Sequence, residues 1–119
     1  MFYRPGTDDP KPAHSPIKAI VSPRPIGWIS TRNADGSANL APYSFFNAIS
    51  DNPPMVMFGS TGGKTDRAFG KDSLANIQAS GEFVVNIVSR KLVDAMNLTS
   101  GDYAAGQDEF ELAGLEKAP

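Results

Sequence analysis

The fold is decided by a short stretch of sequence that runs IGWISTR over 26–32, NADG over 33–36 and SANLA over 37–41. The first part is rich in β-branched and aromatic residues, which favour strands. In the middle part, Gly36 can adopt the positive φ that a tight hairpin turn requires. The stretch therefore predicts a strand over 26–32, a hairpin turn over 33–36 and a return strand over 37–41.

The segments after this hairpin are short and are separated by proline or glycine. We expect Pro42 to end the ladder of the return strand, because proline has no N–H to donate. Residues 43–50 then form either an extended strand or a bulged loop, and the pattern leaves both alternatives open. The apolar run over 55–60 predicts a short buried strand.

The second half of the chain alternates helical and strand patterns. Residues 72–81 predict a two-turn helix with a capping residue at its start and Gly81 at its C-cap. Residues 82–88 predict a strand that places alternate apolar side chains on one face. The remaining expectations are a helix that Ser89 caps, with an apolar stripe of Leu92, Val93 and Met96, and a last pairing segment with Phe110, Leu112 and Leu115.

The composition is that of one small domain over residues 1–119, with a mass of 12.7 kDa and 40% hydrophobic residues. Eleven glycines and ten prolines leave little room for long helices and exclude a helical bundle. Residues 1–16 hold four prolines and predict an irregular arm. The fold class we expect is mainly β: a small β-barrel with short helices, or an α+β sheet.

The net charge and the residue composition exclude several classes of binding partner. The net charge is −2 and the pI is about 5.2, so the chain lacks the basic surplus that nucleic-acid binding requires. Cysteine is absent, which excludes disulfides and thiolate chemistry. The chain starts without an apolar leader and contains no run of roughly 18 apolar residues, the length of a membrane span. We expect a soluble cytoplasmic protein without nucleic-acid or membrane partners.

Side chains that could perform catalysis by themselves are scarce. His14 is the only histidine and falls in the proline-rich arm, where we interpret it as a solvated loop residue. We therefore predict no catalytic side chain and no metal ligands. Neither a phosphate-binding P-loop nor a G-x-G-x-x-G motif occurs. Any chemistry is expected to come from a cofactor.

Three segments could hold such a cofactor. Residues 59–65 form a turn rich in glycine and hydroxyl groups, whose backbone N–H groups could bind an anion. Residues 71–73, Lys-Asp-Ser, stand at a helix start, where either a phosphate or a plain N-cap would fit. Residues 39–47 combine flat apolar side chains with small polar groups, which suits an isoalloxazine ring. The alternative for that third segment is a core aromatic pair of Phe45 and Phe46.

Together these segments resemble the flavin reductase-like family of FMN-binding split-barrel proteins. The resemblance rests on five ordered strings, at 22–31, 39–47, 53–57, 71–73 and 81–86, and extends to 109–115. It implies a Greek-key split barrel, a homodimer and FMN near the subunit interface. The residues along the flavin would then be Asn39, Ala41, Pro42, Tyr43, Ser44, Phe45, Phe46 and Asn47. The phosphate would be held by Ser60, Thr61, Lys71 and Ser73, beside Asp72. Trp28 would lie near the site.

The function implied by the resemblance is hydride transfer from NADH or NADPH to bound FMN, which needs no side-chain base. Two alternatives stay open: a flavin-binding or electron-carrying module without turnover, and a structural or dimerisation unit. The sequence departs from the family pattern where Gly63 to Gly70 separate the two phosphate-binding segments. Similar proteins also continue with further barrel strands, so we expect a barrel incomplete at its C-terminus, as a natural short form or a fragment.

Overall fold

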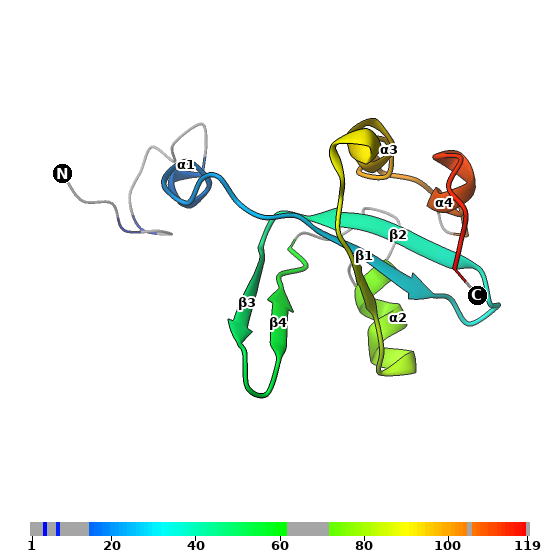
Figure 1. The fold of residues 1–119 in the computed structure, drawn as a ribbon, viewed down its shortest axis with the longest axis horizontal. Helices are drawn as coiled ribbons and strands as arrows, with labels where there is room; N and C mark the ends of the chain where they lie inside the picture. Colours follow the sequence, from blue (N-terminus) through cyan, green and yellow to red (C-terminus); the bar gives the residue numbers. More distant parts are fainter. Residues whose placement is uncertain (1–3, 5–6, 8–14, 62–71, 105, 119) are drawn as a thin grey trace.

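The computed structural model describes residues 4, 7, 15–61, 72–104 and 106–118 (Figure 1), and the structural statements below concern this part of the chain. Most of the irregular arm, including His14, lies outside it, as do Lys71 and the segment from Gly63 to Gly70. In chain order the elements are α1 (Pro16–Ile20), β1 (Gly27–Arg32), β2 (Ala38–Tyr43), β3 (Phe46–Ser50), β4 (Met55–Phe58), α2 (Asp72–Ser80), β5 (Val84–Asn86), the 3₁₀ helix η1 (Arg90–Leu92), α3 (Val93–Leu98) and α4 (Glu109–Leu112).

The predicted hairpin is confirmed and forms two strands of a three-stranded antiparallel sheet with the order β2-β1-β5. In its turn, the N–H of Asn33 donates to the carbonyl of Ser37 at 2.8 Å, and the N–H of Gly36 donates to the carbonyl of Asn33 at 2.9 Å. Gly36 has a φ of 87°. The Asp35 carboxylate accepts from the backbone N–H and the hydroxyl of Ser37. Local turn chemistry is therefore sufficient to set the register of β1 and β2.

The prediction that Pro42 ends the ladder is wrong, because β2 continues through Pro42, opposite Trp28, to Tyr43. Antiparallel strands alternate between residues that bond across the pair and residues whose N–H points away. Ala38 and Leu40 donate their N–H groups to α4, away from β1. Pro42 belongs to the same alternate set, so its missing N–H removes no bond from the ladder.

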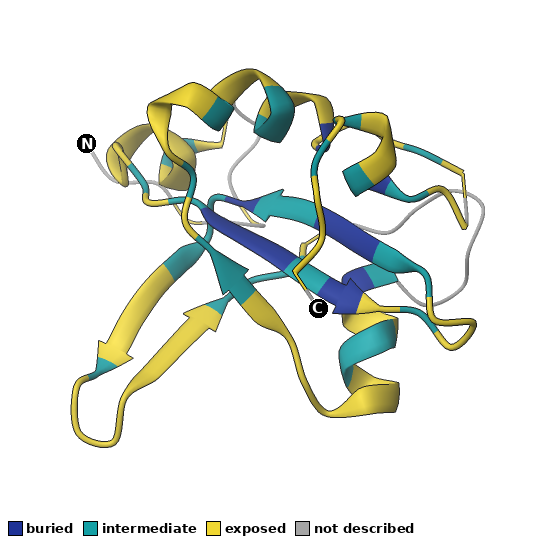
Figure 2. Ribbon diagram, turned by 45° about the vertical axis from the view of Figure 1, so that its right-hand side comes forward, coloured by how far each residue is buried: buried dark blue, intermediate teal, exposed yellow. Residues whose placement is uncertain are grey.

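Two helical layers cover the sheet from opposite sides (Figures 1 and 2). Helix α2 packs on β1 and β2 from one side, and α3 and α4 pack on β2 from the other. The buried hydrophobic side chains between them come from the two long strands, as the dark blue segments of Figure 2 show. They are Trp28, Ile29, Leu40 and Tyr43, each at most 4% exposed. The core is small and lies along β1 and β2.

The β3–β4 hairpin forms a separate two-stranded sheet that projects from this core (Figures 1 and 2). The extended alternative for 43–50 is thus confirmed from Phe46 onward, with a bulge between Ala48 and Ser50. The strand predicted over 55–60 is confirmed for Met55–Phe58, but its predicted burial is wrong. Met55, Val56 and Met57 are 46%, 43% and 55% exposed, because Phe46 and Phe58, at the base of the hairpin, make its contacts with the sheet.

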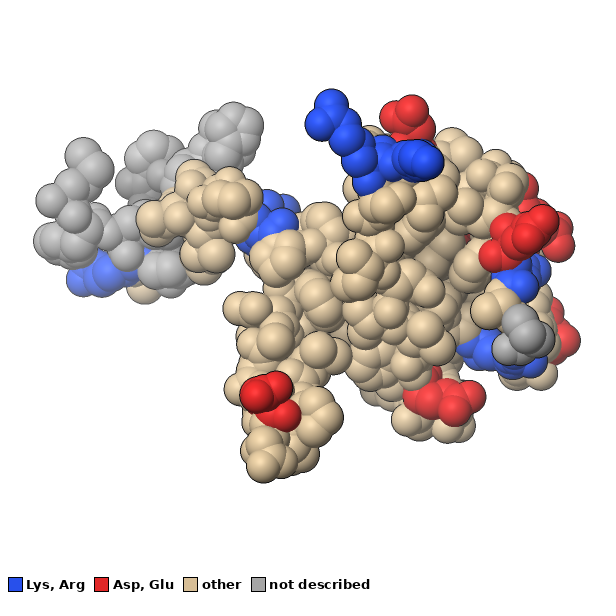
Figure 3. All heavy atoms as spheres, viewed as in Figure 1, with Lys and Arg blue, Asp and Glu red and all other residues tan. Residues whose placement is uncertain are grey.

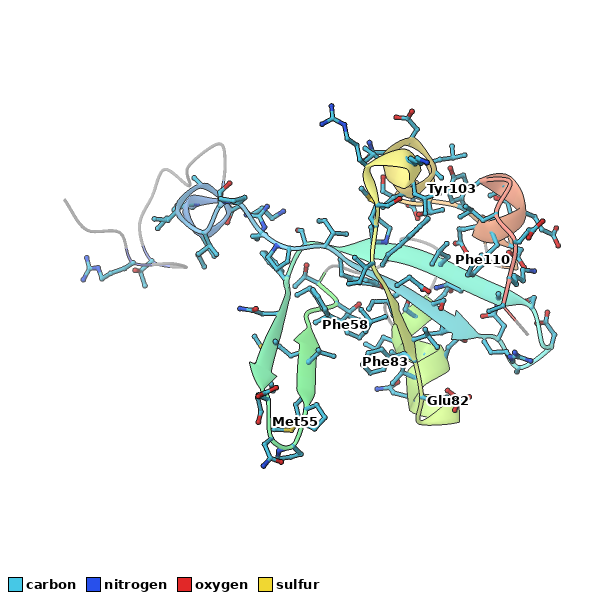
Figure 4. The ribbon with its side chains drawn as sticks, in the orientation of Figure 1. Met55, Phe58, Glu82, Phe83, Tyr103 and Phe110 are labelled. Atoms are coloured by element: carbon cyan, nitrogen blue, oxygen red, sulfur yellow. The ribbon has the colours of Figure 1, made fainter. Side chains whose placement is uncertain are left out.

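Aromatic side chains join the hairpin to the sheet. The rings of Tyr43 and Phe58 lie 4.8 Å apart, and Phe58 meets Phe83 edge-on at 5.2 Å. Figure 4 shows Phe58 and Phe83 directed toward one another from β4 and from the start of β5. Phe46 packs against Gly27, where a Cβ atom would lie 2.6 Å from Cδ2 of the ring. The absence of a side chain at Gly27 permits this close approach.

The helical and strand predictions for the second half are partly confirmed. The two-turn helix is α2, and Gly81 ends it with a φ of 76°. The strand over 82–88 shortens to Val84–Asn86, since only these residues pair with β1. The Ser89 side chain makes no capping bond, although η1 and α3 follow it. The last pairing segment is wrong: Asp108 accepts from the N–H groups of Phe110 and Glu111, and this N-cap starts helix α4 instead.

The described strands form two sheets and no closed barrel, so the structure is mainly β with short helices. None of the helices in this part of the chain has the length and hydropathy of a membrane-spanning segment.

Candidate functional site

The candidate site is a pocket of about 190 Å³ at the outer edge of β2. It opens between the start of α2, the loop that follows α3, and α4. A volume of this size is below the roughly 300 to 1,000 Å³ of pockets that enclose a whole small-molecule ligand, so it would hold part of a cofactor. Its lining residues among those described are Asn39, Ala41, Pro42, Tyr43, Asp72, Ser73, Thr99, Ser100, Gly101, Asp102 and Glu109.

The pocket brings together two of the segments that the sequence singles out. Asn39, on β2, donates from Nδ2 to Oγ of Ser73, at the start of α2, over 2.8 Å. Both side chains are buried, at 4% and 1% exposure. Asn39 faces α2 because alternate residues of a strand point to opposite faces. Of the predicted cofactor-binding residues, the structure places six around this pocket: Asn39, Ala41, Pro42, Tyr43, Asp72 and Ser73.

The second half of the predicted flavin segment does not line the pocket. Ser44 follows β2 in a bend, and Phe45 lies with its ring 5.7 Å from the Arg24 guanidinium carbon. Phe46 packs on Gly27, and Asn47 is exposed. Phe45 and Phe46 are both only half-buried and lie outside the hydrophobic core, so the structure does not show the alternative of a core aromatic pair either.

The predicted phosphate-binding residues are only partly assembled. Ser60 is half-buried and Thr61 is exposed, and both follow β4 without lining the pocket. Asp72 and Ser73 line it, whereas Lys71 lies outside the described residues.

Trp28 acts on the pocket through another residue. It is 3% exposed and does not line the pocket, but its Nε1–H donates to Oγ1 of Thr99 at 2.9 Å. The Thr99 hydroxyl in turn donates to the carbonyl of Met96 at 2.9 Å. The indole thus holds the end of α3, from which the pocket-lining loop 99–102 continues.

The loop 99–102 and Glu109 line the pocket although no sequence pattern pointed to them. Within the loop, Gly101 lies so close to Tyr103 that a Cβ atom would be 2.7 Å from Cζ of the ring. The Tyr103 hydroxyl donates to the carbonyl of Leu98 at 2.7 Å, and Figure 4 shows this ring between α3 and α4. Ser-Gly-Asp at 100–102 was a visible turn signal, but a turn signal alone does not show that the turn meets β2.

Three acidic residues line the pocket: Asp72 at the start of α2, Asp102 in the loop after α3 and Glu109 on α4. Figure 3 shows acidic side chains gathered over the end of the molecule that carries α4. Burial acts to raise the pKa of Asp108, but hydrogen bonds from Lys117 and from the N–H groups of Ala38 and Glu111 outweigh it and lower the pKa. The bond to Asp108 raises the pKa of Lys117. Among the described residues, no group of three His, Asp or Glu side chains could hold a metal ion.

This arrangement suits a ligand with one flat face and several hydrogen-bonding groups. Ala41 and Pro42 offer apolar contact. The Ser73 hydroxyl can donate, whereas those of Thr99 and Ser100, whose protons go to the carbonyls of Met96 and Asn97, can accept. A family model described as the flavin reductase like domain matches residues 21–119. The chain belongs to this family.

Curated relatives extend beyond the matched part of the flavin reductase-like chain. A protein of Aquifex aeolicus is 42% identical over 99 residues, which cover 83% of this chain and 50% of the relative. A protein of Deinococcus radiodurans is 43% identical over 109 residues, which cover 87% of this chain and 46% of the relative. The chain thus spans about half the length of these relatives.

Solved structures of similar fold support the family assignment. Nitrilotriacetate monooxygenase component B from Bacillus cereus is 35% identical with a TM-score of 0.68, covering 79% of this chain and 44% of that one. The 2-nitrobenzoate 2-nitroreductase NbaA of Pseudomonas fluorescens is 29% identical with a TM-score of 0.69, covering 89% and 51%. A protein of Shewanella frigidimarina with a split barrel domain is 24% identical, with a TM-score of 0.64 over 76% and 42%, and shows the fold alone. The flavin reductase-like chain therefore has a split-barrel type of fold.

Proposed function

We propose that this chain is the FMN-binding part of an oxidoreductase that takes hydride from NADH or NADPH. The observation that carries the proposal is the buried hydrogen bond between Asn39 on β2 and Ser73 at the start of α2. Both residues line the same pocket, and the chain belongs to the flavin reductase-like family. When bound, FMN would supply the atom that accepts the hydride, so no side-chain base is required.

The residues of the pocket would bind and orient the flavin. Ala41 and Pro42 would pack against its ring system, and Ser73, Thr99 and Ser100 would hydrogen-bond to its polar groups. Asn39 fixes the Ser73 hydroxyl by donating to it, which leaves the hydroxyl proton available to a ligand acceptor. For the phosphate we propose Lys71 with Ser60 and Thr61, beside Asp72 and Ser73, since a lysine charge and hydroxyl donors suit that group.

The absorbance spectrum of the purified protein is the first test. We expect flavin absorption bands after addition of FMN and removal of the excess, and oxidation of NADH or NADPH above the rate with free FMN. Ser73→Ala should weaken FMN binding, because it removes a buried hydroxyl of the pocket. The control Ser80→Ala, at the exposed end of the same helix, should not. A protein that stays colourless with added FMN contradicts the proposal.

The phosphate assignment has its own test, since riboflavin lacks the phosphate of FMN. Lys71→Ala should weaken FMN binding much more than riboflavin binding. Fluorescence titration with both flavins measures the two affinities. An equal loss for both contradicts the role of Lys71.

A second candidate is an electron carrier that binds FMN without turnover. This candidate is favoured because the sequence contains no distinct nicotinamide-binding motif. Tight FMN binding without NADH or NADPH oxidation above that of free FMN would support this candidate over the reductase.

We further propose a homodimer in which the β3–β4 hairpin contacts the second copy. Ile49, Met55, Val56 and Met57 are exposed on this hairpin, and unpaired strand edges favour association. A related candidate is that the chain acts mainly as a dimerisation unit. Val56→Lys should convert a dimer to a monomer in light scattering, and it should also weaken FMN binding, because the family resemblance implies FMN near the subunit interface. A wild-type monomer at all concentrations contradicts both ideas.

A further inference from the structure

The outer edge of β2 is closed by carboxylates instead of a strand. The N–H groups that point away from β1 belong to Ala38 and Leu40, and Pro42 has none. Leu40 donates to Oε2 of Glu109 at 3.0 Å, and Ala38 donates to Oδ2 of Asp108 at 3.4 Å. Two successive residues at the start of α4 therefore take the bonds that a neighbouring strand would make.

The two carboxylates differ in their surroundings. Asp108 caps α4 and forms an ion pair with Lys117, which is itself solvent-exposed. Glu109 is only 6% exposed, and its Oε2 accepts the backbone N–H of Leu40 in a buried contact. The bond to Glu109 is the shorter, at 3.0 Å against 3.4 Å, and a buried N–H left without an acceptor is costly. The hydrogen bond from Leu40 to Glu109 is thus stronger than the one from Ala38 to Asp108.

The position of this bond connects it to the pocket. Leu40 stands between Asn39 and Ala41, both of which line the pocket, as Glu109 itself does. The Leu40 N–H belongs to the peptide unit that follows Asn39, so its direction fixes the backbone from which the Asn39 side chain reaches Ser73. Asn39 and Ala41 bond to β1, so loss of the Leu40 bond would loosen the outer side of this wall without releasing it from the ladder.

We propose that Glu109 is a positioning residue of the pocket, holding the Asn39–Ala41 wall through the N–H of Leu40. For its effect on flavin the inference rests on the proposed function, whereas its effect on the backbone does not.

The backbone test is amide hydrogen exchange of the 119-residue chain without flavin, measured by NMR. Glu109→Ala should speed exchange at Leu40 about tenfold or more relative to the rest of β1 and β2, because the buried N–H of Leu40 loses its acceptor. Glu109→Gln retains an oxygen acceptor and should speed it only a few-fold. The control Glu111→Gln removes a carboxylate on the same helix whose side chain is 78% exposed, and it should change nothing at Leu40.

The flavin test compares binding of FMN and riboflavin by the same variants. Glu109→Ala should weaken both by the same factor, about tenfold, and Glu109→Gln should restore most of the affinity.

Unchanged exchange at Leu40 in a folded Glu109→Ala protein overturns the inference. So does weaker flavin binding by Glu109→Gln with normal Leu40 exchange, which would indicate direct ligand contact. If Glu109→Ala does not fold, Glu109→Gln decides by its Leu40 exchange. If the wild-type chain binds no flavin, the proposed function fails, and the exchange result still decides the positioning role.

Discussion

The β1–β2 hairpin and the β3–β4 hairpin are built from similar residues but have opposite environments. In β1 and β2, Ile29 and Leu40 are at most 1% exposed between α2 on one side and α3 with α4 on the other. In β3 and β4, Ile49 and Met57 are both 55% exposed. Apolar residues in a strand are therefore not evidence of burial by themselves. Burial depends on which other elements pack on the strand.

Charge distinguishes the two regions in a complementary way. Asp51 is the only charged residue between positions 36 and 63, so the β3–β4 hairpin is nearly uncharged (Figure 3). The outer edge of β2, in contrast, receives two carboxylates from α4. Acidic side chains thus protect one edge of the sheet, and the edges of the projecting hairpin have no such protection within the described residues.

The largest expected effect comes from the core of the first region. Ile29→Ala should lower the free energy of unfolding by about 2 to 5 kcal/mol, because it leaves a cavity at a fully buried position. The matched control Ile49→Ala, on β3, should change it by less than about 0.5 kcal/mol. Urea denaturation of both variants measures the difference. Equal losses would mean that the β3–β4 hairpin is buried in solution.

The next effect on the free energy of unfolding is expected at the contact between the two hairpins. Gly27→Ala should cost about 1 to 3 kcal/mol of unfolding free energy, because the new methyl group would overlap the Phe46 ring. A second change, Phe46→Leu, should recover part of this loss by making room for the methyl group. Urea denaturation of the single and double variants provides the comparison. A Gly27→Ala protein as stable as the wild type would show that the hairpin does not pack on β1.

An effect of similar size is expected where the core supports the pocket. Thr99→Val should cost about 1 to 3 kcal/mol, since it leaves the buried Nε1–H of Trp28 without its acceptor. Thr99→Ser keeps the hydroxyl and serves as the control. Trp28 is the only tryptophan, so its fluorescence reports the site directly during denaturation. An unchanged emission spectrum in Thr99→Val argues against the Trp28–Thr99 bond.

The smallest effect concerns pH and the carboxylates at the β2 edge. The pKa of Asp108 is lowered from its ordinary value of 3.8, so its stabilising contribution is present above that pH and is lost as the pH falls through the lowered pKa. Asp108→Asn should therefore be less stable than wild type at neutral pH, and the difference should shrink on acidification below pH 3.8. Thermal denaturation of both proteins across this range measures it. A difference that grows on acidification contradicts the assignment.

Local patterns were sufficient wherever neighbouring residues decide the conformation. The β1–β2 turn depends on Asp35, Gly36 and Ser37, and the end of α2 depends on Gly81, so both could be predicted. The helix α4 was missed because Phe110, Leu112 and Leu115 suggested a strand. The N-cap bonds of Asp108 decide it instead. Pro42 was misjudged because its effect depends on which way its missing N–H would point.

The features of the site also divide into those that the local sequence predicts and those that depend on tertiary contacts. By itself the sequence determined the candidate segments 39–47 and 71–73 and the flavin-related family, since residue types and their order are enough for a resemblance. Only the tertiary structure decided that Asn39 meets Ser73, that Trp28 works through Thr99, and that Glu109 holds the edge of β2. These contacts join residues 34, 71 and 69 positions apart, and no local pattern encodes a contact over such separations. They form because burial of the same small core brings β2, α2, α3 and α4 together.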